Sequence, residues 1–301
     1  MTEQDPNAYL EAVLRAQTLT DDSDELTALR ARRTEVDRLL RDGFSDSTPT
    51  LRYAGSKAKC TMIRESFDLD ITCYFGRDDT AAGETLKDIY TNAADVLERE
   101  YFVERKPSAL RLRSKTPSRD DFHVDVVPGR FIDGDDGDVF LYRHSVDKER
   151  QKTNLDMHIS HIRDSGVRPA IRLMKLWNVR NAVNMKTFVL ELLVVDLLSG
   201  KTDACLSDQL LHVFTTFRDN ASALRVEDPA NPGGNDLSEA LNDTIKTIVS
   251  AAARNSIARI EAGGWETLFG PAERLGDEEK RQALLKAPSV IGVRSKPWLD
   301  A

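Results

Sequence analysis

The chain has 301 residues, of which 40% are hydrophobic, enough to bury the core of one large domain or of two closely joined lobes. Its formal net charge at pH 7 is −8, whereas proteins that hold a long polynucleotide usually carry an excess of Lys and Arg along the phosphate path. The composition therefore argues against a long nucleic acid as the partner.

No stretch approaches the roughly 20 apolar residues that a membrane-spanning helix needs, and the N-terminal stretch MTEQDPNAYL is acidic instead of a basic targeting segment. The cysteines are scattered and lack metal-binding spacing, which suits a reducing compartment. We therefore expect a cytoplasmic protein with no membrane partner. We also expect Cys60, Cys73 and Cys205 to be small core residues.

The first predicted element is a long amphipathic helix, which follows a polar N-terminal segment and runs from about Ser23 to Asp42. Gly43 follows it as a stop signal. Its apolar residues recur at the spacing of one helix face, and they are Leu26, Leu29, Val36 and Leu40. We interpret this apolar face as part of the core and not as a surface for a partner.

Strands and helices alternate after this helix. The predicted strands begin near Leu51, Ile71, Leu110 and His123. A helix is predicted between Gly83 and Arg99, and FIDGDDGDVFLY predicts a hairpin with an acidic turn. This turn resembles a calcium-binding loop but lacks the closing glutamate. The elements predict the α+β class, with a mixed β-sheet backed by helices.

The pattern becomes helical from Leu155 onward. One helix follows Pro169, which lies at an early position that helices tolerate. A long helix is predicted from about Asp236 to Ala262, where two glycines stop it. We therefore predict two parts, residues 1–150 with the sheet and residues 151–301 with helices and a C-terminal tail.

Two aspartates lie inside the strand expected around Ile71. This strand alternates apolar and polar side chains, Leu69, Ile71 and Cys73 against Asp68, Asp70 and Thr72. The two carboxylates therefore share a face, where they repel and raise each other's pKa, and a cation between them explains why they coexist. Hard oxygen ligands suit Mg²⁺ or Mn²⁺, and two ions fit this spacing. The alternative is a solvated face of an edge strand.

A Gly-Ser pair precedes these aspartates. Gly55 allows a close approach of the backbone, and Ser56 supplies a hydroxyl beside the amides of the following turn. Turns of this kind bind phosphate. Phosphate beside metal-binding carboxylates is typical of nucleotide chemistry.

A third acid is expected on a neighbouring strand, because two-metal phosphoryl transfer needs a ligand near the attacking hydroxyl. The predicted hairpin consists of Ala109–Arg113, a turn through Pro117, and Phe122–Val127. It places Asp125 in an apolar strand, where an unpaired carboxylate would be costly. The partner of Asp125 is either a metal ion or Arg111 or Arg113 on the adjacent strand, in a structural salt bridge.

The order of these motifs resembles that of the polymerase-β-type nucleotidyltransferases. More narrowly, it is similar to that of the cGAS/DncV-like enzymes of bacteria, the CD-NTases, which make cyclic oligonucleotide second messengers in anti-phage defence. The stretch VEDPANPGGND resembles a loop shared with oligoadenylate synthetases, and WETLFGPA resembles a common ending. The similar motifs extend from residue 55 to about 272. Cys60 stands where members of this family often have glycine.

The resemblance implies a fold and residue roles. The fold would be a catalytic nucleotidyltransferase lobe with a long N-terminal spine helix, followed by a helical nucleotide-binding lobe. Asp68, Asp70 and Asp125 would be catalytic metal ligands, while Gly55 and Ser56 would hold phosphate. The stretch VRPAIRLMKLWN is similar to a helix with a phosphate-contacting lysine, here Lys175. The stretch KTFVLELLVVDLL resembles the next helix, in which Thr187 would meet phosphate and Phe188 would stack on the base, although packing is the usual role of an aromatic residue.

Three functions follow from these motifs. The first is a template-independent enzyme that joins nucleoside triphosphates into a cyclic di- or oligonucleotide and releases pyrophosphate, with two Mg²⁺ or Mn²⁺ ions. The second is a transferase for RNA ends or a small acceptor, which the acidic charge disfavours. The third is an inactive nucleotide-binding module, which the intact aspartates disfavour. For the first, the resemblance also implies regulatory or effector proteins of a defence operon as partners.

Overall fold

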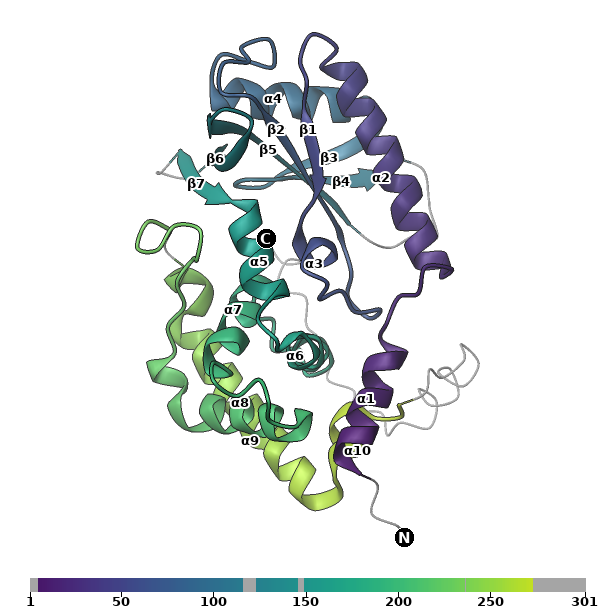
Figure 1. Cartoon of the computed structure of the whole chain (residues 1–301), viewed down its shortest axis with the longest axis vertical. Helices are drawn as coiled ribbons and strands as arrows, with labels where there is room; N and C mark the ends of the chain where they lie inside the picture. Colours follow the sequence, from purple (N-terminus) through teal and green to yellow (C-terminus); the bar gives the residue numbers. More distant parts are fainter. Residues whose placement is uncertain (1–4, 116–122, 146–148, 236, 273–301) are drawn as a thin grey trace, which may run out of the picture.

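The structure is a computed structural model that describes residues 5–115, 123–145, 149–235 and 237–272. Figure 1 shows a β-sheet with its covering helices in one half of the molecule and a group of helices in the other half. Within the described residues, every helix is too short or too polar to cross a membrane. The predicted turn at Pro117, the start of its hairpin strand at Phe122 and the C-terminal tail lie outside the described residues.

The sheet half contains most of the first 154 residues. Its elements are α2 (Asp24–Gly43), β1 (Thr50–Tyr53), α3 (Gly55–Ala58), β2 (Leu69–Phe75), α4 (Leu86–Leu97), β3 (Tyr101–Arg105), β4 (Leu110–Ser114), β5 (Val124–Asp133), β6 (Asp136–Tyr142) and β7 (Arg150–Asn154). The strand order is β1-β2-β5-β4-β3, with β6 paired to β5 and to β7. The β2–β5 pair is parallel and the other pairs are antiparallel, so the predicted mixed sheet is confirmed.

Helices α2 and α4 pack against the face of the sheet that carries Leu69, Ile71 and Cys73, which are all fully buried. The predicted long helix is confirmed, with Ser23 as its N-cap and its four predicted apolar residues buried. Gly43, predicted as a stop, is its last residue. A Cβ at Gly43 would collide with Val96 of α4, so glycine permits this close packing.

The helical half has its own apolar core. Its elements are α1 (Pro6–Ala16), α5 (Leu155–Arg163), α6 (Arg168–Arg180), α7 (Thr187–Leu197), α8 (Leu206–Asn220), the short 3₁₀ helices η1 (Ala221–Ala223) and η2 (Ser238–Leu241), α9 (Asp243–Gly263) and α10 (Trp265–Phe269). Trp177 and Phe214 are fully buried there, with ring centroids 5.3 Å apart. This half therefore forms a second core beside that of the sheet.

Three details differ from the sequence prediction. The N-terminal segment, predicted to be polar, forms α1 with Asp5 as its N-cap, and it buries apolar residues in the helical core. The predicted long helix begins at Asp243, because Asn242 caps it and η2 precedes it. Of the three cysteines only Cys73 is buried, so the prediction of core positions for Cys60 and Cys205 is wrong.

Candidate active site

Three carboxylates lie near the beginnings of two neighbouring strands of the sheet, β2 and β5. Asp70 in β2 and Asp125 in β5 are register partners of the parallel pair. Residues two apart on a strand point to the same face, so Asp68, just before β2, shares the face of Asp70. Its Oδ1 accepts a 3.2 Å hydrogen bond from the amide of His123, just before β5. The predicted placement of the third acid on a neighbouring strand is therefore confirmed.

Asp70 lies in an environment that disfavours its charge. Burial, followed by the negative charges of Asp125 and Asp68, raises the pKa of Asp70 to about 6, although Lys59 and Lys175 act in the opposite direction. Such a carboxylate lacks the positive charge that would neutralise it. The site therefore favours a cation beside Asp70.

Asp125 is paired with an arginine. The guanidinium of Arg111, on β4, donates two hydrogen bonds to it, from Nε at 2.9 Å and from Nη2 at 2.7 Å. The salt bridge left open by the sequence is therefore present. In the part of the chain that the structure describes, no three carboxylate, imidazole or thiol groups are placed so that they could hold a metal ion. A metal ion at Asp125 would have to replace part of the contact with Arg111.

The Gly-Ser pair forms α3, a single turn that follows β1. The amide of Ala54 donates to the backbone carbonyl of Asp70 at 2.9 Å and so fixes this turn beside β2. Gly55 has a φ of +53°, and a Cβ there would overlap the Asp70 carboxylate. Ser56 is buried, and its carbonyl accepts a 3.0 Å hydrogen bond from the amide of Thr61. Only glycine lets the turn approach the acids this closely.

Cys60, at the end of this turn, is exposed and has a φ of +56°, a left-handed conformation typical of glycine. We expect Cys60→Gly to raise the free energy of unfolding by up to about 1 kcal/mol. The reason is that relief of left-handed strain, about 1–2 kcal/mol, exceeds the entropic cost of glycine, about 0.5–1 kcal/mol. Urea denaturation measures the difference. Cys60→Ala, which keeps the strain, is the control, and a variant Cys60→Gly no more stable than this control contradicts the argument.

Four residues form a buried charge cluster behind the turn, and they are Lys59, Thr61, Lys175 and Glu191. Glu191, on α7, is fully buried, pairs with Lys59 and accepts a 2.6 Å hydrogen bond from Thr61 Oγ1. Lys175, on α6, donates to the Thr61 carbonyl at 2.8 Å and lies 3.9 Å from Glu191 Oε1. With two lysines and one glutamate, the cluster places net positive charge behind the turn and joins the turn to the helical half.

Lys175 is held firmly within this cluster. Its exposed fraction is 4%, and burial lowers its pKa to about 8, while Glu191 acts to raise it. Its Nζ therefore contacts the back of the turn at the carbonyl oxygen of Thr61. Direct contact between Lys175 and a nucleotide phosphate stays a prediction.

The other two residues that were predicted to contact the nucleotide are the first two residues of α7. Thr187 is exposed, and Phe188 is partly buried. The Nζ of Lys59 lies 5.2 Å from the centroid of the Phe188 ring, so Phe188 adjoins the buried charge cluster. The ring of His158, on α5, also packs against Phe188, with ring centroids 4.8 Å apart. Phe188 thus lies close to the positive charge behind the turn, and stacking of a base on its ring stays a prediction.

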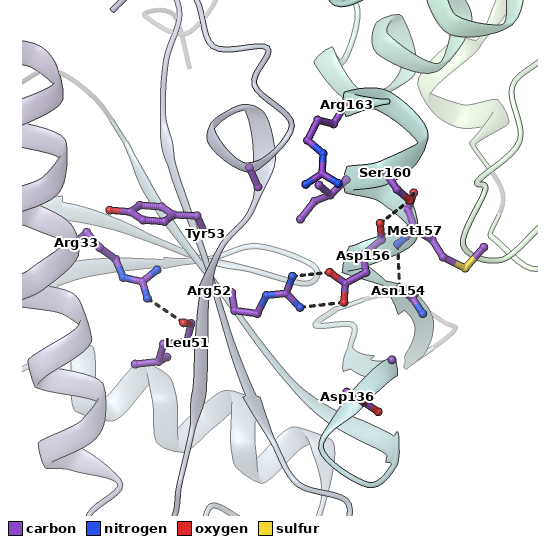
Figure 2. A pocket seen from close by; sticks show the side chains of 13 residues that line it. Arg33, Leu51, Arg52, Tyr53, Asp136, Asn154, Asp156, Met157, Ser160 and Arg163 are labelled. Carbon is purple, nitrogen blue, oxygen red and sulfur yellow. Dashed lines mark hydrogen bonds and ion pairs between the residues drawn. The ribbon is translucent and has the colours of Figure 1, made fainter. Parts of the chain in front are cut away.

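A cavity of about 810 Å³ lies on another side of α3, along the outer edge of β1 (Figure 2). Three arginines line it, and each has a carboxylate partner: Arg33 with Asp37, Arg52 with Asp156, and Arg163 with Asp164. Figure 2 shows the Arg52–Asp156 ion pair spanning from β1 to α5. Because these arginines are paired with carboxylates, and because Asp68, Asp70 and Asp125 do not line the cavity, we do not place a nucleotide in it.

The sequence analysis gave no role to Glu191. The sequence feature that could have identified Glu191 is its position as the single acidic residue within the apolar stretch TFVLELLVV. A charge buried in an apolar helix needs a partner, so this position predicts a buried ion pair. The partners, Lys59 and Thr61, come from a segment far away in the sequence, so the stretch itself does not identify them.

Comparison with known protein families gives no match, and no curated protein sequence matches either. Solved structures are similar in fold. CdnC of E. coli MS115-1, solved with ATP, has 18% identity and a TM-score of 0.67, over 91% of this chain and 100% of that chain. The CD-NTase CdnG of Bradyrhizobium diazoefficiens, in complex with GTP, has 14% identity and a TM-score of 0.66, over 94% and 98%.

A third similar structure is the cyclic AMP-GMP synthase DncV of Vibrio cholerae, with 15% identity and a TM-score of 0.56, over 89% of this chain and 85% of that chain. These likenesses cover both halves of the molecule. The chain therefore has the fold of the CD-NTases, with a nucleotidyltransferase sheet and a helical half.

Proposed function

We propose that this chain is a template-independent nucleotidyltransferase that joins nucleoside triphosphates into a cyclic di- or oligonucleotide second messenger, releases pyrophosphate and acts in anti-phage defence. The observation that carries the proposal is the placement of Asp68, Asp70 and Asp125 near the beginnings of β2 and β5, beside the turn at Gly55. The fold supports it, because CdnC, CdnG and DncV share this architecture.

The three carboxylates supply the oxygen ligands that divalent ions such as Mg²⁺ or Mn²⁺ prefer, and two ions would bind once the side chains move closer together than they lie in the described structure. Asp70 has a raised pKa and lacks a cationic partner within hydrogen-bond distance among the described residues, so its oxygens suit a metal ion. Asp68 and Asp125 would complete the ligand set, with Arg111 giving up part of its contact. When bound, the ions would supply positive charge at the reacting phosphate and lower the pKa of the attacking ribose hydroxyl.

The chain itself would bind and orient the triphosphate. Gly55 and Ser56 would let the backbone and a hydroxyl approach the β- and γ-phosphates. Lys175 and Thr187 would add a positive charge and a hydroxyl to the same phosphates, and Phe188 would stack on the base. These groups would hold the α-phosphate in line with the attacking hydroxyl, which is most of what phosphoryl transfer requires.

The partners follow from the same proposal. Nucleoside triphosphates would be the substrates, and no long nucleic acid is expected. One similar structure is a complex of CdnC with a HORMA protein. A regulatory protein of a defence operon is therefore a reasonable partner class for this chain as well, in a cytoplasmic setting.

Incubation with the four ribonucleoside triphosphates and Mg²⁺ or Mn²⁺ tests the function. We expect short oligonucleotides without any primer, a fraction of which survives phosphatase because a cyclic product has no terminal phosphate. Mass spectrometry identifies this fraction. Extension of an added RNA primer without any primer-independent product, at high protein concentration and with both ions, assigns the chain to RNA-end transfer instead. Nucleotide binding without product indicates an inactive module.

A further inference from the structure

A small cavity opens between the two halves beside Phe188, and we call it the Phe188 cavity. Its volume of about 360 Å³ is near the lower end of the roughly 300–1,000 Å³ usual for ligand pockets. Ser108, Arg143 and Gln151 of the sheet half line one part of it, and Phe188 and Asn235 of the helical half line another. The cavity therefore suits a ligand about the size of one nucleoside.

The aromatic wall of this cavity is held in place. Phe188 packs against His158, whose Nε2 lies 2.6 Å from Oδ1 of the buried Asp228. Asn235 Nδ2 donates to the other oxygen of Asp228 at 2.6 Å and to the carbonyl of Lys152 at 2.9 Å. The loop and the ring are thus fixed to each other before any ligand enters, which lowers the entropic cost of binding.

Arg143 lines this cavity and has one buried donor that lacks a partner among the described residues. Its Nε is buried and, among the described residues, has no hydrogen-bond partner. A buried donor of a charged group without an acceptor is costly and calls for an explanation. Arg143 is partly exposed and lines the Phe188 cavity, so a ligand there would meet the outer part of its guanidinium, which is fixed in orientation by the buried Nε.

The lining favours a base over a phosphate as this ligand. Pro107, Val189, Leu237 and Ala240 add apolar walls to the ring of Phe188, and the negative charge of Glu239 offsets the positive charge of Lys186 in the same lining. Guanidinium carries donors only, and the O6 and N7 of guanine are two adjacent acceptors that it binds in a bidentate manner. Adenine places an amino donor at the same edge, so it would oppose a donor with a donor.

We propose that Arg143 selects guanine in the Phe188 cavity, so that the chain prefers GTP over ATP at this position. The inference rests on the proposed function only in requiring that a nucleoside triphosphate enters the site. Arg143 acts as a specificity residue through the planar fork of its guanidinium, and not through its charge alone.

Affinities of the full chain for GTP and ATP, measured by calorimetry with Ca²⁺ in place of Mg²⁺ to slow transfer, test this proposal. We expect wild type to favour GTP, Arg143→Met to lose about 10- to 100-fold in GTP affinity with little change for ATP, and Arg143→Lys to lose less, because an ammonium also donates to guanine but lacks the planar fork. Arg150→Met is the matched control, since Arg150 belongs to the same β6–β7 hairpin but does not line the cavity. It should keep the preference.

Equal losses for GTP and ATP in Arg143→Met, with recovery in Arg143→Lys, mean a phosphate contact and overturn the proposal. An unchanged preference in both variants, or no binding of either triphosphate, overturns it too. A preference for GTP that depends on Arg143, without any oligonucleotide product, upholds this inference while the proposed synthase activity fails. Product formation without base preference does the reverse, so the two failures are distinguishable.

Discussion

Asp70→Asn is expected to lower nucleotide incorporation by at least about 1,000-fold, the size of effect that loss of an essential catalytic group has in other enzymes. The amide keeps the shape of the side chain but does not supply the anionic ligand that a divalent ion requires. Incorporation of labelled triphosphates with Mg²⁺ measures the loss. Near wild-type incorporation by this variant would show that Asp70 is not a metal ligand.

The same variant should be more stable than wild type in the absence of metal ions. Because the pKa of Asp70 is about 6 in the folded chain and 3.8 as its reference value, its charge opposes folding, by about 3 kcal/mol once both pKa values are exceeded. Below about pH 4 the Asp70 carboxyl is protonated in both states and does not oppose folding. As the pH rises through about 6 the carboxyl loses its proton in the folded chain, and the wild type loses this stability. Asp70→Asn should lack that loss.

Melting temperatures at pH 5 and pH 7.5, with and without Mg²⁺, separate the cost of the Asp70 charge from the stabilisation by a bound metal ion. Wild type should lose more stability than Asp70→Asn over this interval, and Mg²⁺ should raise the melting temperature of wild type only, since a ligand that binds the folded state stabilises it. An equal response of wild type and Asp70→Asn to Mg²⁺ would contradict the metal site.

Local patterns allowed the acids and the strands that carry them to be predicted. Alternation of apolar and charged residues identifies β2, and Asp125 within an apolar strand indicates a neighbour of β2, because these patterns depend only on adjacent residues. The partner of Asp125 depends on the register between β4 and β5, which brings Arg111 opposite it. From the sequence, Arg111 and Arg113 were both possible partners of Asp125, and only the pairing of the strands distinguishes them.

The helical half was predicted less well where long-range contacts decide. Helix α1 buries Tyr9, Leu10 and Val13 against helices that follow much later in the chain, a contact with no local signal. Lys175 was predicted to contact phosphate because its helix resembles a helix of the CD-NTases. Its position behind the turn, however, depends on contacts with Thr61 and Glu191. Such a cluster forms only when three segments meet, so no single stretch of sequence encodes it.

Glu191→Gln is expected to lower the free energy of unfolding at pH 7 by about 3–5 kcal/mol, because it leaves the positive charges of Lys59 and Lys175 buried without a counter-ion. Glutamine has nearly the same shape, so a loss of packing does not account for such a change. Urea denaturation measures it. Lys175→Met should be much less harmful, since Lys59 keeps its pairing with Glu191.

The pH dependence identifies charge as the cause. Burial already lowers the pKa of Lys175 to about 8, and removal of Glu191, which acts to raise it, lowers it further. A lysine with a lowered pKa costs stability as the pH falls through that value, and the cost disappears as it deprotonates. The deficit of Glu191→Gln should therefore shrink between pH 7 and pH 9, and adding Lys175→Met should restore part of the stability at pH 7. An equal deficit at both pH values, unchanged by Lys175→Met, would mean that Glu191 serves packing and hydrogen bonding to Thr61 instead.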